Sequence, residues 1–195
     1  MATLVVSPVS GANNQGFWDV SSTTLGHFEV SLGDPDSGPA VLGSYVWMPA
    51  VAIPQGATIT SAVMDFVNWE ASTGVTSSIR THASDNSTKP AELKSDIVGR
   101  TRTTASTSWA TGALTPGQSV VTPNFSGVVQ EVVNRAGWVS GSGMTVIFDY
   151  VSGAYTAFKS GTDSGYVTPK MTVNYTAGGP PVVITTDFVG WGIPI

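Results

Sequence analysis

Short stretches rich in valine, isoleucine, threonine and aromatic residues recur along this chain, with turn-forming segments such as SGANNQG, GDPDSGP and TAGGPP between them. Apolar and polar residues alternate in TSSIRTHA (76–83) and KMTVNYT (170–176), as in strands that place one face on a core and the other in solvent. The regular turn signals predict a sandwich or barrel of about eight to ten strands. The clearest strands span 3–9, 27–32, 43–51, 57–70, 76–83, 144–151, 155–160 and 170–176.

One segment departs from this alternation and predicts a single short helix over about 123–136. Its apolar residues follow the i, i+3, i+4, i+7, i+8 spacing of an amphipathic helix: Phe125, Val128, Val129, Val132 and Val133. Thr122 and Pro123 suit its start, Gly137 suits a left-handed cap at its end, and we expect Trp138 to cover that end. The polar residues expected to face solvent are Gln130, Glu131 and Asn134.

Four successive stretches resemble a β-sandwich module of jelly-roll type that occurs in bacterial surface proteins and in phage virion proteins. They are IPQGATITSAVM, RTRTTASTSW, TPNFSGVVQEVVNRAGWVSGSGMTVIF and PKMTVNY. In that family a strand introduced by IPxGATI, a helix of the VVQEVVNRxGW kind and a closing P-x-hydrophobic-x-V-x-Y strand occur together. The resemblance covers roughly residues 53–175. It implies a jelly-roll sandwich with a binding or structural role, and it transfers no catalytic residue to this chain.

Composition supports one all-β domain and argues against nucleic acid as a partner. The chain has 195 residues with 41% hydrophobic content, which predicts one domain, residues 1–176, and a further segment, residues 177–195. Only 11% of the residues are charged, and the net charge is −5. An acidic chain without a basic stripe has no electrostatic means of binding a phosphate backbone.

Cysteine is absent, so the fold must be stable through packing without disulfides. The opening MATLVVSPVSGANNQ has neither a positively charged region nor a long apolar core, and we therefore expect synthesis in a cytoplasm without the general secretion route. No segment reaches the roughly 18 consecutive apolar residues of a membrane helix. A membrane is not an expected partner.

Candidate chemistry is sparse, and the sequence predicts neither an enzyme nor a cofactor. The two histidines, His27 and His82, have no metal-ligand spacing and do not adjoin a Gly-x-Ser-x-Gly motif. The loop GDPDSGP (33–39) has two carboxylates that suggest calcium, but it lacks the further acidic positions that a calcium loop needs. A plain turn is the favoured interpretation of that loop.

The role of the tryptophans has two competing interpretations, sugar binding and core packing. A β-sandwich that binds sugars uses exposed aromatic rings as stacking platforms, and Trp18, Trp47 and Trp69 are candidates for that role. A sandwich without disulfides also fills its core with large rings, and packing is the favoured role for any single tryptophan.

The C-terminal segment AGGPPVVITTDFVGWGIPI (177–195) is apolar where a loose terminus is normally polar. Its two glycines and two prolines form a hinge and a stiff spacer, which suits an arm that reaches another subunit. The interface residues expected on this arm are Val183, Phe188, Val189, Trp191, Ile193 and Ile195. The alternative is that the segment forms a last strand of its own domain.

Together these features predict a non-enzymatic structural component of a phage virion, made in the host cytoplasm. The specific expectation is a capsid decoration or cement protein that binds the head shell and stabilises it. Its expected partners are the major capsid protein or other virion subunits, and further copies of this chain in a dimer or trimer. One alternative is a carbohydrate-binding module or host-surface adhesin. A third is a tail or fibre component, or a subunit of an extracellular filament.

Overall fold

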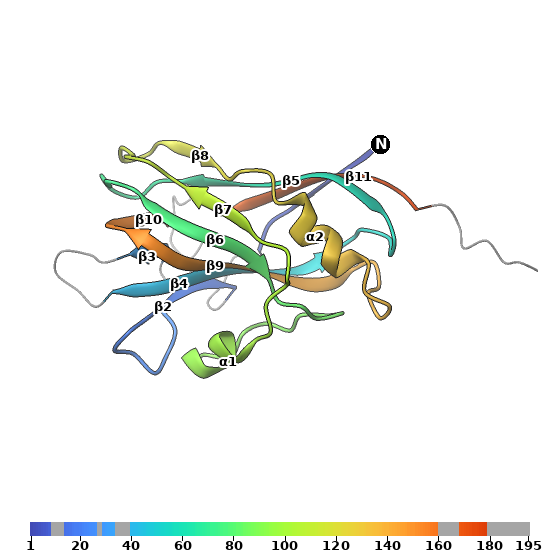
Figure 1. The fold of residues 1–195 in the computed structure, drawn as a ribbon, viewed down its shortest axis with the longest axis horizontal. Helices are drawn as coiled ribbons and strands as arrows, with labels where there is room; N and C mark the ends of the chain where they lie inside the picture. The colour runs from blue at the N-terminus through green and yellow to red at the C-terminus, as the bar shows by residue number, and fades with distance from the viewer. Residues whose placement is uncertain (9–13, 27–28, 34–39, 160–167, 179–195) are drawn as a thin grey trace, which may run out of the picture.

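The protein is a β-sandwich, as the sequence predicts. A computed structural model describes residues 1–8, 14–26, 29–33, 40–159 and 168–178. Within these residues two sheets face one another, and two short helices lie outside them (Figure 1).

The first sheet has four antiparallel strands and forms the upper layer in Figure 1. Its order is β1 (Ala2–Val6), β11 (Lys170–Thr176), β5 (Thr58–Val67) and β8 (Ser119–Val121). The last strand therefore lies inside the sheet, paired with β1 on one side and β5 on the other. Its Met171 and Val173 are fully buried, which confirms the alternation predicted for this strand.

The second sheet has seven strands, and six of them form one path. Their order is β10 (Tyr155–Lys159), β3 (Glu29–Gly33), β4 (Val41–Val51), β9 (Ser142–Gly153), β6 (Val75–Thr81) and β7 (Thr107–Ala110). The seventh, β2 (Gln15–Asp19), pairs with β4 beside this path. Each strand predicted from the sequence overlaps one of these strands, whereas the short strands β2, β7 and β8 were not predicted.

A cluster of four aromatic rings fills the space between the sheets. Phe66 of β5 lies 4.9 Å from Phe158, and Trp109 lies 5.3 Å from Phe158, measured between ring centroids. Phe148 contacts Phe66 edge-on at 5.6 Å. Offset and edge-to-face ring contacts of this kind add to the free energy that burial of the rings already provides. This chain therefore closes its core with aromatic packing where a small secreted domain would use disulfides.

Helix α2 (Ser126–Val133) packs against β5 and β6, at the position where the amphipathic spacing predicts a helix. It is shorter than the predicted range because the residues before it bind to β5. Thr122 accepts a hydrogen bond from the Met64 N–H through Oγ1, and Asn124 accepts one from the Ala62 N–H through Oδ1 (both 2.9 Å). The apolar stripe is buried as predicted: Phe125, Val128, Val129, Val132 and Val133.

Two residues of α2 that were expected to face solvent instead bind neighbouring backbone, so that prediction is wrong for them. The Gln130 side chain accepts from the Ile59 N–H and donates to the Ala57 carbonyl, both at 2.8 Å. The Glu131 carboxylate accepts from two successive N–H groups, those of Thr104 and Ala105. Gln130 therefore fastens the helix to the start of β5, and Glu131 fastens it to the loop before β7.

The end of α2 also differs from the prediction. Its cap is Asn134 in a right-handed conformation, and Gly137 is not a left-handed cap. Gly137 instead permits the close approach of Asp85. A Cβ added at Gly137 would lie 2.2 Å from Asp85 Oδ2. Trp138 is buried, and its indole N–H donates to the Ile53 carbonyl at 2.9 Å.

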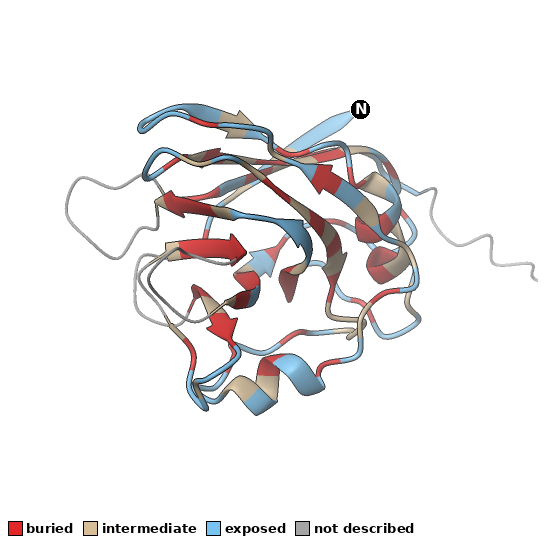
Figure 2. Ribbon diagram, turned by 60° about the vertical axis from the view of Figure 1, so that its left-hand side comes forward, coloured by how far each residue is buried: buried red, intermediate tan, exposed pale blue. Residues whose placement is uncertain are grey.

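Helix α1 (Lys94–Gly99) was not predicted, because its six residues hold only one buried apolar side chain, Ile97. It covers the outer face of the second sheet and appears below that sheet in Figure 1. Figure 2 shows its buried side turned toward the sheet and its exposed side toward solvent. A second, smaller core lies beneath it, made of Trp18, Leu25, Tyr45, Ile97 and Ile147.

Replacing Val132 with aspartate tests the placement of α2. The new carboxylate would be buried without a partner, so we expect the free energy of unfolding to fall by about 3 kcal/mol or more. For a domain of this size that corresponds to a decrease of roughly 6 to 12 °C in melting temperature. Asn134→Asp, at the exposed cap that follows the same helix, is the matched control. Equal melting curves for the two variants would contradict the placement.

Candidate functional site

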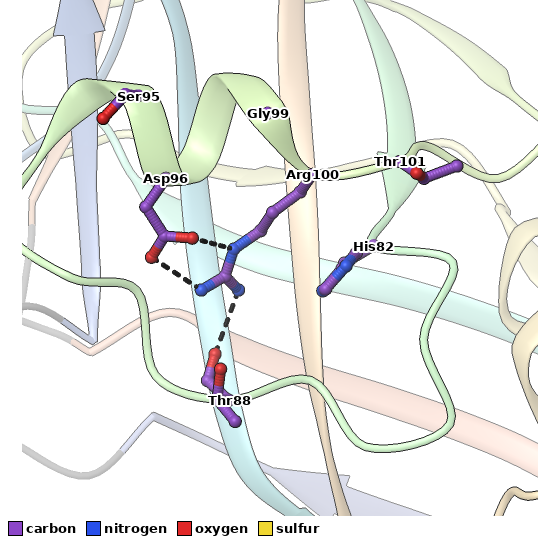
Figure 3. A pocket seen from close by; sticks show the side chains of 7 residues that line it. All are labelled: His82, Thr88, Ser95, Asp96, Gly99, Arg100 and Thr101. Carbon is purple, nitrogen blue, oxygen red and sulfur yellow. Dashed lines mark hydrogen bonds and ion pairs between the residues drawn. The ribbon is translucent and has the colours of Figure 1, made fainter.

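The most concentrated group of buried polar side chains surrounds Arg100, which directly follows α1. The Arg100 guanidinium is paired with Asp96 one helical turn earlier, with Nε 3.2 Å from Oδ1 and Nη2 3.0 Å from Oδ2 (Figure 3). The same carboxylate accepts a hydrogen bond from the Ala91 N–H at 2.6 Å. This bidentate geometry, with two parallel N–H···O hydrogen bonds, is the strongest arrangement available to an arginine and a carboxylate.

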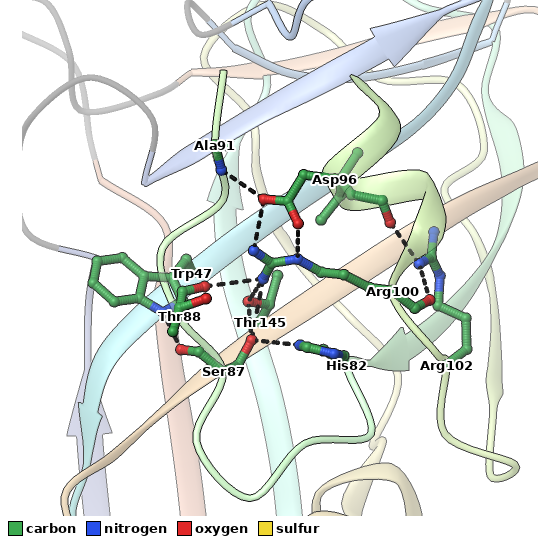
Figure 4. Close-up of polar contacts among 10 residues, drawn as sticks. Trp47, His82, Ser87, Thr88, Ala91, Asp96, Arg100, Arg102 and Thr145 are labelled. Carbon is green, nitrogen blue, oxygen red and sulfur yellow. Dashed lines mark hydrogen bonds and ion pairs between the residues drawn. The ribbon is translucent and has the colours of Figure 1, made fainter. Parts of the chain in front are cut away.

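The other nitrogen of the guanidinium binds oxygens from two further parts of the chain. Nη1 donates to the Thr88 carbonyl at 2.9 Å, to Thr145 Oγ1 of β9 at 3.1 Å and to Ser87 Oγ at 3.2 Å (Figure 4). The Ser87 carbonyl in turn accepts from the Trp47 indole N–H at 2.7 Å. We call Arg100, Asp96, Ser87, Thr145 and His82 the Arg100 cluster.

The imidazole of His82 completes the Arg100 cluster, with Nδ1 2.9 Å from Ser87 Oγ. Burial, together with the positive charges of Arg100 and Arg102, lowers the pKa of His82 from its ordinary 6.5 to about 4. His82 is therefore neutral at pH 7. Burial alone would raise the pKa of Asp96, but hydrogen bonds from Arg100 and the Ala91 N–H outweigh it, so this pKa lies below its usual value and the carboxylate is charged.

A serine hydroxyl beside a histidine suggests a nucleophile and its base, but the surroundings of Ser87 do not allow that chemistry. Ser87 is only 1% exposed, so a substrate has no path to its hydroxyl. Its Oγ also lies within hydrogen-bond distance of Thr145 Oγ1, at 2.7 Å, and accepts from Arg100. The pair is part of a structural network that holds α1 against β9.

A polar hollow of about 420 Å³ opens over the Arg100 cluster. Its lining residues are His82, Thr88, Ser95, Asp96, Gly99, Arg100 and Thr101 (Figure 3). The charges of Arg100 and Asp96 cancel and His82 is neutral, so the hollow carries no net charge to attract an ion. In the described part of the chain, no group of three or more His, Asp or Glu side chains is placed to hold a metal ion.

A second hollow, of about 390 Å³, lies on the opposite flank of α1 and is mainly apolar. Its lining residues are Ser22, Thr23, Leu93, Lys94, Ser95 and Val98, and we call it the α1 groove. Leu93 and Val98 remain 54% and 51% exposed there. Large apolar side chains held at a surface in this way are typical of a contact site.

The three tryptophans predicted as stacking platforms have different surroundings. Trp18 is buried in the smaller core, with the Arg102 guanidinium 5.8 Å from its ring centroid. Trp47 is half-buried and bonded to the Ser87 carbonyl. Trp69 as a residue is 41% exposed, and Lys159 Nζ lies over its ring, 5.9 Å from the centroid. Of these three, Trp69 is therefore the most exposed residue.

The other predicted site residues lie outside the part of the chain that the structure describes. They are His27, residues 34–39 of the acidic loop, and the arm residues Val183, Phe188, Val189, Trp191, Ile193 and Ile195. Their expected roles stay predictions.

Sequence reasoning did not single out the Arg100 cluster. One local signal was present, because Asp96 and Arg100 stand at the i, i+4 spacing of a helical ion pair. Thr145 lies 45 residues from Arg100 in sequence, and no local pattern connects them.

Comparison with protein-family models and with curated proteins finds no match for this chain. Among the residues that the structure describes, no helix has the length and apolar composition required to cross a membrane.

The depressed pKa of His82 predicts a specific loss of stability in acid. Between about pH 6.5 and pH 4 the unfolded chain binds a proton at this residue and the folded chain does not, so stability should fall as the pH is lowered through that window. Urea unfolding of the wild type and of His82→Gln at several pH values measures the difference. We expect a smaller decrease in His82→Gln, and equal decreases in both proteins would contradict the geometry of the Arg100 cluster.

Proposed function

We propose that this chain is a non-enzymatic structural component of a phage virion, and specifically a decoration or cement protein that binds the capsid shell. The observation that carries the proposal is the position of β11. β11 is paired on both sides and its apolar residues Met171 and Val173 are buried, so this strand needs no further partner from the residues that follow it. The apolar segment that follows, 177–195, is then available for contacts with another subunit.

We further infer that the sandwich is a jelly roll. Its antiparallel pairs are nested, with β1 beside β11, β4 beside β9, β5 beside β8 and β6 beside β7. This nesting is what results when one long hairpin of eight strands is rolled into two sheets, as in jelly-roll domains built from two Greek keys. Viral capsid domains and lectins are among the proteins with that architecture, which supports a structural or binding role.

The Arg100 cluster supports a role without catalysis. Its serine is inaccessible, its histidine is neutral and bonded to that serine, and its charged pair is satisfied internally. A protein made to remain folded on a particle needs a rigid domain more than it needs reactive side chains. Both the aromatic core and this polar network provide that rigidity.

Carbohydrate binding is a second candidate, favoured by the surroundings of Trp69. An exposed indole with a lysine ammonium 5.9 Å from its centroid combines an apolar stacking face with a hydrogen-bond donor. A host-surface glycan would require both features. Such a site is compatible with a virion protein that acts as an adhesin.

Removing the segment after Ala177 tests the proposed function. We expect the shortened chain to fold with a melting temperature close to that of the full chain, because the buried residues of the two sheets and of α2 form one core among themselves. Light scattering should show association of the full chain and a monomer after truncation. Trp191→Ala alone should weaken association, since a large aromatic anchor dominates many interfaces.

Two results would contradict the proposal. Unfolding or aggregation of the shortened chain would make the segment a strand of its own domain. A full chain that is monomeric and absent from purified particles of the phage that encodes it would favour the carbohydrate-binding alternative.

A further inference from the structure

The α1 groove is an apolar surface with rigid walls. Thr24 and Leu93 form an antiparallel bridge, and the Lys94 N–H donates to the Thr23 carbonyl at 2.9 Å. The Lys94 ammonium donates to the Asp19 carbonyl at 2.6 Å, which joins α1 to the end of β2. The 19–25 loop is therefore held against the start of α1 by hydrogen bonds from both the backbone and the side chain of Lys94.

The loop side of the groove is stabilised by Asp19. Its carboxylate accepts hydrogen bonds from the backbone N–H groups of Ser21 and Ser22, at 2.8 and 2.6 Å. Burial alone would raise the pKa of Asp19, but these hydrogen bonds outweigh it and the pKa is lowered. Beneath the loop and α1, Leu25 and Ile97 belong to the smaller core. A binding surface fixed in advance in this way loses little entropy when it is occupied.

We propose that the α1 groove binds residues 179–195 of a second copy of this chain. The inference rests on the proposed role in assembly and names the surface through which copies associate. The groove is apolar and has one charged lining residue, Lys94. The segment is apolar and has one charged residue, Asp187, of the opposite sign. Its large side chains suited to the groove are Val182, Val183, Ile184, Phe188, Val189, Trp191, Ile193 and Ile195.

The position of Gly178 favours a second copy over the same chain. Gly178 lies against the turn between β4 and β5, where an added Cβ would be 2.7 Å from the Gly56 carbonyl oxygen. It follows β11 of the first sheet, whereas α1 lies on the far side of the second sheet (Figure 1). To reach its own groove the segment would have to pass the second sheet to its far side, and Pro180 and Pro181 disfavour an early reversal of the chain. A neighbouring copy can present its groove without that detour.

A complementation experiment tests this inference with two altered chains. The first ends at Ala177 and has the groove without the segment. The second is the full chain with Val98→Asp, which has the segment but places a charge in the groove. We expect each to be monomeric alone in light scattering, and the mixture to form a one-to-one heterodimer through a single seated segment.

Val139→Asp is the matched control, because Val139 is 65% exposed and does not line the groove. This variant should associate as the wild type does, whereas Val98→Asp should raise the dissociation constant of self-association at least tenfold. Both substituted side chains are exposed in the isolated chain, so both variants should melt as the wild type does at protein concentrations low enough for the wild type to be monomeric.

Several outcomes would overturn the inference. If truncation abolishes association but Val98→Asp does not, the segment binds elsewhere, and the proposed role in assembly still stands. If the full chain is monomeric and Val98→Asp lowers its melting temperature, the groove binds the segment of its own chain. If the full chain neither associates with itself nor binds to particles, the proposed function fails together with the inference.

Discussion

The buried guanidinium of Arg100 is the interaction on which the outer layer of this protein depends. A buried charge without partners costs several kcal/mol, so the chain around Arg100 must supply acceptors on every side. Asp96 supplies them from α1, Thr88 from the segment before it, and Thr145 from β9. Meeting that requirement holds α1 against the second sheet, covers the smaller core and shapes the polar hollow that Arg100 lines.

Much of the sandwich was predictable, because buried and less buried residues alternate locally in β5, β6 and β11. The longer strands β4 and β9 instead contain runs of consecutive buried residues, which their apolar composition indicates. The strands β7 and β8 have four and three residues and form by pairing with longer strands, so no local pattern located them. In β2 the buried residues include the polar Gln15 and Asp19, so its composition does not mark a strand. In α2 the apolar spacing identified the buried face. It did not reveal that loop backbone lies beside Gln130 and Glu131, which is a property of the tertiary structure.

The candidate site was less predictable than the fold, since its members come from distant parts of the sequence. Ser87 and Thr145 are 58 residues apart, yet their hydroxyl oxygens lie 2.7 Å from one another. The apolar C-terminal segment was recognisable from its composition alone. The α1 groove is visible only in the folded structure, because its walls come from two segments about 70 residues apart. The proposed assembly combines these two features, an apolar segment visible in the sequence and a groove whose walls are joined by hydrogen bonds between α1 and the 19–25 loop.

The most direct test of this dependence is hydrogen exchange, followed by mass spectrometry, on Arg100→Met. The account predicts that the amides of α1, from Lys94 to Gly99, exchange much faster in the variant, while those of β4 and β9 keep their protection. Wild-type exchange throughout α1 would contradict the account, because the helix would then be held in place without the guanidinium. An equal loss of protection in β4 and β9 would also contradict it, because Arg100 would then support the whole sandwich and not the outer layer alone.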